Sequence, residues 1–254
     1  MTNEEELLYK RFIELAKKSD SACYFTFTDF LGLAEQSVFE AAKLAIGKIR
    51  YTKFGGILGT ERIMIRFGNP EELGYEELFP IRVLKVEPKS AKFADKLTHR
   101  DFLGAILNLG IERKLIGDIV IRDNVGYVFV KDEISDFLAS ELTKIKHTDV
   151  KISTITDDSL PEGELFRTER VKIQLAGERL DAVISKIFNI SRDDSLSLFK
   201  KGLVFVGGKK IENNSYTPKA NDVVSVRGYG RFIYRGTVGL SKKGKLNAEV
   251  DIYV

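Results

Sequence analysis

The chain of 254 residues has one cysteine, two histidines and no tryptophan. A single cysteine, Cys23, can form neither a disulfide within the chain nor a multi-thiolate zinc site, which favours a reducing cytosol. Two isolated histidines, His99 and His147, do not make a metal site, so we expect no cofactor. The longest apolar run, residues 102–111, is about half of the 18 or so residues that cross a bilayer. The acidic N-terminus also lacks the basic start of a signal peptide. The sequence therefore predicts a cytoplasmic protein with no membrane partner.

The charge is unevenly distributed along the chain. The formal net charge is only +3, but residues 167–254 contain 17 Lys and Arg against 9 Asp and Glu, a net charge of +8. Residues 1–166 therefore carry a net charge of −5. A basic C-terminal third on an acidic body is typical of a module that binds a polyanion, although a solvated basic face is the alternative. Glycines and aromatic residues between the charges favour nucleic acid.

Residues 1–78 are expected to form a small α/β domain. Apolar residues at helical spacing predict a helix over residues 4–18. Thr28 is expected to cap a second helix with a broad apolar face. Two alternating runs, residues 50–54 and 62–67, flank a glycine-rich connection and predict a pair of strands.

Residues 79–157 predict a second domain with the element order β-α-β-β-α-β. Thr98 and Asp101 form a capping-box pattern ahead of its first helix. This order is the split βαβ arrangement of ferredoxin-like and RRM-like domains, so the predicted fold class is α+β. The strands are expected at residues 81–86, 117–121, 125–130 and 150–155, and the helices at residues 102–109 and 133–146.

The third strand of this domain carries two aromatic residues on one face. It reads VGYVFV over residues 125–130, a partial match to the strand on which RRM domains stack bases. Tyr127 and Phe129 share a face because side chains two apart in a strand point the same way. They are a secondary candidate site for RNA, although the same face could equally belong to the core.

Residues 158–166 are expected to be a linker, because Pro161 and Gly163 lie in a polar stretch. Residues 167–254 then predict a third, basic domain. Arg179 opens its first helix, and Ser191 is expected to cap its second. Strands are expected at residues 203–206, 209–211 and 222–227.

Four segments of this basic domain resemble S4-type RNA-binding domains. They are Arg179-Leu180-Asp181, Ser191-Arg192, residues 200–209 with the sequence KKGLVFVGGK, and residues 220–224 with the sequence ANDVV. The resemblance implies an αL-like fold, in which two helices pack against a small bent sheet and present one basic groove to structured RNA. A C-terminal strand extension follows.

A longer resemblance covers nearly the whole chain. The segments FPIR at residues 79–82, LTHRDFLGAILNLGI at 97–111, IGDI at 116–119 and SVRGYGRF at 225–232, followed by Lys242-Lys243-Gly244, resemble the YlmH family. The resemblance implies a bacterial cytosolic protein with an RRM-like middle domain and a C-terminal S4-type domain. It also implies ribosomal RNA and tRNA as partners, a role in the rescue of stalled large ribosomal subunits, and a link to cell division.

Nine residues of the basic domain have the chemistry that RNA binding needs. The guanidinium groups of Arg179 and Arg192 begin the two helices and can hold phosphates bidentately. Four lysines offer mobile charges around the same groove, and the segment 227–231 places an aromatic ring between two cations and two glycines. A glycine-rich turn with Tyr229 over a small core is the alternative for that segment. The candidate RNA-binding residues are Arg179, Arg192, Lys200, Lys201, Lys209, Lys210, Arg227, Tyr229 and Arg231.

An RNA-modifying enzyme is the alternative class of function. Arg179-Leu180-Asp181 resembles the catalytic motif of pseudouridine synthases, but it begins the small basic domain. Residues 55–59 are glycine-rich but lack the helix and the acidic partner of a methyltransferase cofactor loop. The cluster Thr98-His99-Arg100-Asp101 is explained better by helix capping than by acid–base catalysis. We therefore expect a non-catalytic, monomeric RNA-binding protein of the large ribosomal subunit, active in ribosome-associated quality control or translation. An adaptor of the division machinery is a further alternative.

Overall fold

The computed structural model describes residues 1–155, 160, 162–241 and 244–254. The chain forms two compact units, Met1–Leu165 and Phe166–Val254. The predicted boundary between residues 78 and 79 falls within the first unit and stays a prediction. Within the described ranges, no helix combines the length and the apolar character needed to span a membrane.

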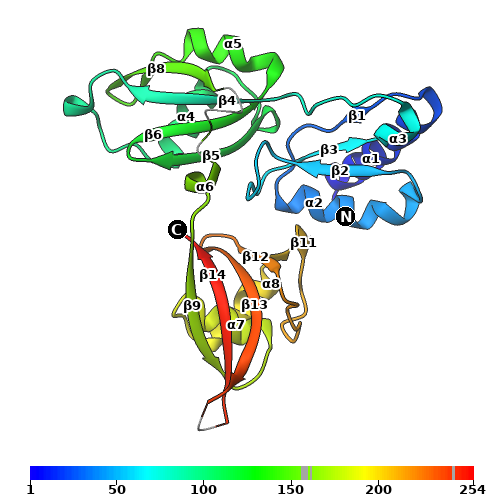
Figure 1. Cartoon of the computed structure of the whole chain (residues 1–254), viewed down its shortest axis with the longest axis vertical. Coiled ribbons are helices and arrows are strands. Elements are labelled where there is room, and N and C mark those ends of the chain that lie inside the picture. Colours follow the sequence, from blue (N-terminus) through cyan, green and yellow to red (C-terminus); the bar gives the residue numbers. More distant parts are fainter. Residues whose placement is uncertain (156–159, 161, 242–243) are drawn as a thin grey trace. The chain divides into compact units, whose positions relative to one another are not determined.

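The first unit begins with two helices and a three-stranded antiparallel sheet (Figure 1). The elements are α1 (Asn3–Ala22), β1 (Thr26–Phe27), α2 (Leu33–Ile46), β2 (Tyr51–Phe54), β3 (Met64–Phe67) and α3 (Pro70–Leu73). The strand order is β1-β3-β2. Phe12 of α1, Phe39 of α2 and Phe67 of β3 belong to one buried cluster, so both helices pack on this sheet. The two predicted helices and the predicted strand pair are present.

The prediction that Thr28 caps the second helix is wrong. The helix begins at Leu33, and Gly32 is its N-cap. The Thr28 hydroxyl instead accepts a hydrogen bond from the backbone N–H of Ile65 on β3, at 2.9 Å. Leu31 lies in an extended segment and forms an isolated β-bridge. A hydrogen bond to a strand distant in sequence therefore replaces the local capping interaction.

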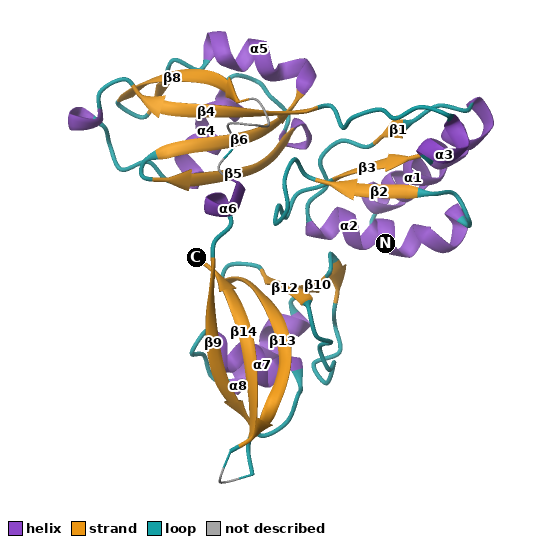
Figure 2. Cartoon of the chain, viewed as in Figure 1, coloured by secondary structure: helices purple, strands orange, loops and turns teal. Residues whose placement is uncertain are grey.

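The rest of the first unit has the element order β-α-β-β-α-β with one additional short strand. Its elements are β4 (Ile81–Pro88), η1 (Ala91–Phe93), α4 (His99–Asn108), η2 (Arg113–Leu115), β5 (Ile116–Arg122), β6 (Val125–Lys131), α5 (Asp132–Glu141), β7 (Lys144–Ile145), β8 (Thr148–Ile155) and α6 (Glu162–Leu165). The five strands are antiparallel in the order β5-β6-β4-β8-β7. Helices α4 and α5 share one buried cluster with alternate residues of β4 and β6, so both cover the same face of the sheet (Figure 2).

Local signals set the helix starts in this region better than the helix ends. The Asp101 carboxylate accepts the Thr98 backbone N–H at 2.8 Å, which confirms the capping pattern before α4. The prediction that the next helix runs to residue 146 is wrong, because α5 ends at Glu141. Ile145 is fully buried, but it lies on β7 and pairs with Thr148 of β8. An apolar spacing that suits a helix is here produced by a hairpin.

The predicted linker, residues 158–166, lies partly outside the described residues. Of its last part, Glu162–Leu165 forms the short helix α6. Leu165 is buried, and its carbonyl accepts a hydrogen bond from Arg122 at 2.8 Å. This turn of helix therefore belongs to the first unit.

The second unit combines two short helices with a six-stranded antiparallel sheet. Its elements are β9 (Thr168–Leu175), α7 (Leu180–Ile187), α8 (Arg192–Lys200), β10 (Val204–Val206), β11 (Lys209–Lys210), β12 (Asp222–Val226), β13 (Gly230–Leu240) and β14 (Leu246–Tyr253). The strand order is β11-β10-β12-β13-β14-β9. The Ser191 hydroxyl accepts the Asp194 N–H at 3.0 Å and caps α8 as predicted. Strand β9 and the long β13–β14 ribbon have no predicted counterpart with defined bounds.

Candidate nucleic-acid interface

Two of the predicted arginines converge on one buried carboxylate in the second unit. Arg179 is the N-cap of α7, and Arg192 is the first residue of α8. The Arg179 Nε and Nη2 donate to the two carboxylate oxygens of Asp181 at 3.0 and 3.2 Å. The Arg192 Nε donates to Asp181 Oδ2 at 3.2 Å. The backbone carbonyl of Asp181 also accepts the Ser195 hydroxyl at 2.8 Å, which ties α8 to α7.

This arrangement fixes two guanidinium groups at the surface. The Asp181 side chain is 0% exposed, whereas those of Arg179 and Arg192 are 43% and 56% exposed. A guanidinium has five N–H donors, so both arginines retain donors that Asp181 does not use. The buried carboxylate therefore orients both side chains and leaves donors for an anion such as a phosphate.

The four predicted lysines are all exposed, at two places in the second unit. Lys200 and Lys201 lie at the C-terminal end of α8, and Lys201 is its C-cap. Lys209 and Lys210 form β11, the strand at one edge of the sheet. Lys210 pairs with Glu212 at 2.9 Å.

Residues 227–229 form the turn between β12 and β13, and Arg231 lies at the start of β13. The Tyr229 ring is 45% exposed, and its centroid lies 5.6 Å from that of Phe188. The ring therefore covers Phe188 with one part and presents the remainder to solvent. The Arg227 guanidinium lies 5.1 Å from the Phe205 ring centroid, and that of Arg231 lies 3.9 Å from the Tyr253 centroid.

The structure does not bring all nine predicted residues into one groove. Val204 and Val206 of β10 belong to the core that contains α7 and α8. Alternation along the strand therefore turns Phe205, and Arg231 in the same cross-strand row, toward the other face of the sheet. Arg179 and Arg192 lie at the helix starts, whereas Arg231 lies on the sheet face opposite the helices.

A second arginine pair on that opposite face was not among the predicted residues. Arg170 donates to both carboxylate oxygens of Asp251, at 2.7 and 3.1 Å, and the Arg235 Nε donates to Oδ2 at 2.7 Å. The hydrogen bonds from Arg170 and Arg235 lower the pKa of Asp251 to about 2. Acids at the outward positions of the alternating run AEVDIY, Glu249 and Asp251, are the signal that indicates such a pair.

The secondary candidate site on β6 is largely closed. Phe129 is 0% exposed, and a Cβ on Gly56 would lie 2.5 Å from its Cδ1 atom. Phe129 also lies beside Gly117, whose other close neighbour is Phe30. Tyr127, on the same face, is partly exposed. Of the two aromatic residues, only Tyr127 has a surface that a base can reach.

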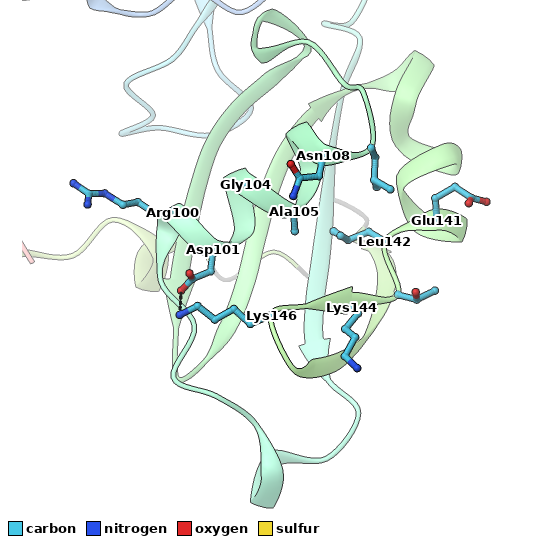
Figure 3. A pocket seen from close by; sticks show the side chains of 11 residues that line it. Arg100, Asp101, Gly104, Ala105, Asn108, Glu141, Leu142, Lys144 and Lys146 are labelled. Atoms are coloured by element: carbon cyan, nitrogen blue, oxygen red, sulfur yellow. Dashed lines mark ion pairs between the residues drawn. The ribbon is translucent and has the colours of Figure 1, made fainter.

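The first unit has a shallow groove of about 630 Å³ between α4 and the segment that leads into β7 (Figure 3). Lys146 pairs with Asp101 across it at 2.9 Å. The hydrogen bond from Lys146, followed by those from Thr98, lowers the pKa of Asp101 to about 2. The groove is lined by Arg100, Asp101, Gly104, Ala105, Asn108, Leu109, Glu141, Leu142, Thr143, Lys144 and Lys146. No group of three or more His, Cys, Asp or Glu with metal-binding geometry occurs among the described residues.

Comparisons with known proteins give consistent matches. Residues 75–159 match a family model described as "Putative RNA-binding domain in YlmH". The chain is 30% identical over 228 residues to "Ribosome-associated protein quality control protein P2" of Bacillus subtilis (strain 168), which covers 86% of this chain and 83% of that protein. A solved structure, "Cell division protein ylmH from Streptococcus pneumoniae", has a TM-score of 0.49 and 21% identity, and the match covers 61% of this chain and 93% of that one. On the sequence identity, which extends over most of both chains, and on the match of the family model, this chain belongs to the YlmH family.

Proposed function

We propose that the chain is a non-catalytic protein that binds structured RNA, namely ribosomal RNA and tRNA on the large ribosomal subunit. In this proposal residues 1–78 form a small α/β domain, residues 79–157 an RRM-like domain, and residues 167–254 an S4-type domain. The S4-type domain provides most of the affinity through phosphate contacts. The protein acts in ribosome-associated quality control or translation, with the link to cell division that the family resemblance implies.

The observation that carries this proposal is the pair of guanidinium groups held by Asp181. Phosphate is the complementary ligand, because its oxygens accept two parallel N–H bonds from one guanidinium. Two guanidinium groups held in defined positions can contact two phosphates at a matching separation. A folded RNA backbone offers such fixed separations, so the pair selects RNA shape rather than base sequence.

The relatives support the same assignment. The Bacillus subtilis protein is named for ribosome-associated quality control, and the family model that matches residues 75–159 is described as RNA-binding. The net charge of +8 in residues 167–254 adds long-range attraction for a polyanion. Ribosomal RNA agrees both with the names of the relatives and with the positive charge of residues 167–254.

The test is the salt dependence of binding to purified ribosomal RNA by the full chain and by the double variant Arg179→Gln, Arg192→Gln. Each lost phosphate contact lowers the slope of log K against log salt by about 0.7 to 0.9, so the variant should lose about 1.5 in slope and bind more weakly. The variant Lys186→Gln, Lys219→Gln removes the same charge elsewhere in the second unit and should keep most of the slope. An unchanged slope in the arginine variant, or no binding by the natural chain, would refute the proposal.

A separate experiment tests the proposal that the protein is not an RNA-modifying enzyme. RNA incubated with the protein, with and without S-adenosylmethionine, is digested to nucleosides and examined by mass spectrometry. We expect no new modified nucleoside. A new one would assign the chain to the RNA-modifying enzymes.

A further inference from the structure

The sheet face on which an RRM-like domain would stack bases is not free in this protein. Phe129 is completely buried on that face, next to Gly56, Gly117 and Phe30. The contact with Gly56 is so close that a side chain at position 56 would overlap the phenylalanine ring. On this face only Tyr127 remains partly exposed, so a wider RNA contact by the middle of the chain would use another surface as well.

The loop between β4 and α4 carries an unusually exposed aromatic side chain. We call residues 89–97 the Phe93 loop; in Figure 2 it includes the short helical turn beyond the arrowhead of β4. Phe93 is 79% exposed on this turn. A single exposed apolar side chain is common on protein surfaces, so the case for a contact here rests on how the turn holds the ring and on the charges near it.

Hydrogen bonds hold both ends of the Phe93 loop in place. The Lys89 N–H donates to the Asp149 carbonyl at 2.8 Å. The Asp95 N–H donates to the Thr148 hydroxyl at 2.8 Å, and the Leu97 N–H donates to the Asn124 side chain at 2.9 Å. Phe93 is thus presented by a fixed turn of the chain, so little conformational entropy is lost when it binds.

Three cationic residues lie close to Phe93 in the sequence, and the Lys92 Nζ lies 5.5 Å from the centroid of its ring. Lys92, Lys96 and Arg100 are exposed and form no ion pair within the part of the chain that the structure describes. The Asp95 carboxylate accepts the His147 N–H at 3.1 Å, so the loop adjoins the β7–β8 turn that contains Lys146. Arg100 and Lys146 both line the groove; in Figure 3 the Lys146 ammonium points to Asp101, whereas the Arg100 guanidinium points outward.

We propose that the Phe93 loop and the adjoining groove form a second RNA contact, in which an unpaired base stacks on Phe93 and the flanking phosphates lie against Lys92, Lys96 and Arg100. This inference rests on the proposed function, since it presumes an RNA partner. Base stacking suits a lone exposed ring, because a base requires only one π face. A protein partner would favour a wider apolar patch around Phe93, whereas the ring contact that the structure gives is with the Lys92 ammonium.

The first test substitutes the ring. Phe93→Ala in the full chain should weaken binding to a single-stranded oligouridylate by about 5-fold to 150-fold, the range for loss of one stacked base. Phe93→Leu keeps an apolar side chain of similar exposure but no π face, so it should lose most of the same affinity. Both variants should melt within a few degrees of the natural chain, because the side chain contributes little to the core. If the Phe93→Leu variant binds the oligouridylate with the same affinity as the natural chain, the stacking assignment is overturned and a protein partner is favoured.

The second test places a charge in the groove without weakening the fold. Gly104 lies inside α4, and a Cβ there would meet no other atom within 4 Å. Glutamate or glutamine at this position replaces a helix-interior glycine with a better helix former, which stabilises the helix by about 0.5 kcal/mol. Gly104→Glu should bind RNA several-fold more weakly than Gly104→Gln, although both variants should be at least as stable as the natural chain. Equal affinity of the two would overturn the groove as part of the contact.

Ultraviolet crosslinking to ribosomal RNA, followed by peptide mass spectrometry, separates this inference from the proposed function. We expect crosslinked peptides from the Phe93 loop as well as from the second unit. Crosslinks confined to residues 166–254, together with full affinity of the Phe93 variants, would overturn the second contact and leave the proposed function standing. No RNA binding by the natural chain would refute both.

Discussion

Replacing Asp181 by asparagine should weaken RNA binding, although it makes the surface around Arg179 and Arg192 more positive. Asparagine has the same shape, so the change removes the negative charge and one of two acceptor oxygens. The three hydrogen bonds that now hold the guanidinium groups depend on both oxygens. The two arginines should therefore gain freedom in the unbound protein and lose it again on binding.

Two opposing contributions decide whether Asp181→Asn strengthens or weakens RNA binding. Immobilising one long side chain on binding costs about 0.5 to 1.5 kcal/mol, so two released arginines weaken binding by about 1 to 3 kcal/mol, or about 5-fold to 150-fold. In the opposite direction, a unit charge about 7 Å from a phosphate in water contributes about 0.6 kcal/mol, and less at physiological salt. The loss of orientation therefore exceeds the gain in charge.

The assay is a titration of ribosomal RNA with the natural chain, Asp181→Asn and the control Asp193→Asn. Asp193 lies in the first turn of α8, is exposed, and contacts neither arginine in the hydrogen bonds and ion pairs of that site. Its substitution changes the net charge by the same amount and should leave affinity equal or slightly higher. In Asp181→Asn the salt slope should stay close to that of the natural chain, because both cations are still present to meet phosphates.

Stability has to be checked separately, because Asp181 is fully buried. Breaking an ion pair with both partners buried costs about 3 to 5 kcal/mol, but these arginines are about half exposed, which reduces the loss to about 1 to 2 kcal/mol. Titrations are therefore made well below the melting transition of the variant. Binding by folded Asp181→Asn that equals or exceeds that of Asp193→Asn would refute the orienting role.

The remaining predictions concern the second unit. Asp251→Asn should lower the melting temperature at pH 7, and the difference from the natural chain should shrink as the pH falls from about 4 to 2. The folded pKa of about 2 lies below the ordinary value of 3.8, so the contribution of Asp251 is present above 3.8 and is lost as the pH falls through 2. A difference that stays constant down to pH 2 would contradict this assignment. Residues 166–254 alone should unfold cooperatively and retain salt-dependent RNA binding, because this unit has a core of its own; a fragment that folds but does not bind would show that the rest of the chain is required.

The sequence predicted those elements whose signals are local. The capping patterns at Thr98 and Ser191 depend on residues three positions apart, and both helices begin where these patterns place them. The two helix errors arise where distant residues decide the outcome. Thr28 is engaged by β3, and Ile145 is buried by pairing with β8. Neither interaction can be read from nearby positions, because each depends on a strand elsewhere in the chain.

In the candidate site, too, local features could be predicted from the sequence and features that depend on distant residues could not. The types of residue suited to RNA could be selected from the sequence, because Arg, Lys and an aromatic between glycines have a recognisable chemistry. Their assignment to one groove could not, because it depends on which face of the sheet Arg231 occupies relative to the helix starts that carry Arg179 and Arg192. The closure of Phe129 by Gly56 is likewise a contact between segments more than 70 positions apart. The choice between core and RNA platform for that ring was open in the sequence because both need the same alternation.

Two of the nine acidic residues in residues 167–254 each accept hydrogen bonds from two arginines. Asp181 lies under Arg179 and Arg192, and Asp251 lies under Arg170 and Arg235, in each case with the carboxylate buried and the guanidinium groups at least partly exposed. Each carboxylate reduces the net charge by one while fixing two cations in a defined orientation. Net charge sets the long-range attraction for a polyanion, but it does not measure this orientation. A variant with either aspartate neutralised should therefore approach RNA as fast as the natural chain or faster, and also dissociate faster. Association and dissociation rates measured separately would distinguish these two effects, which an equilibrium constant combines.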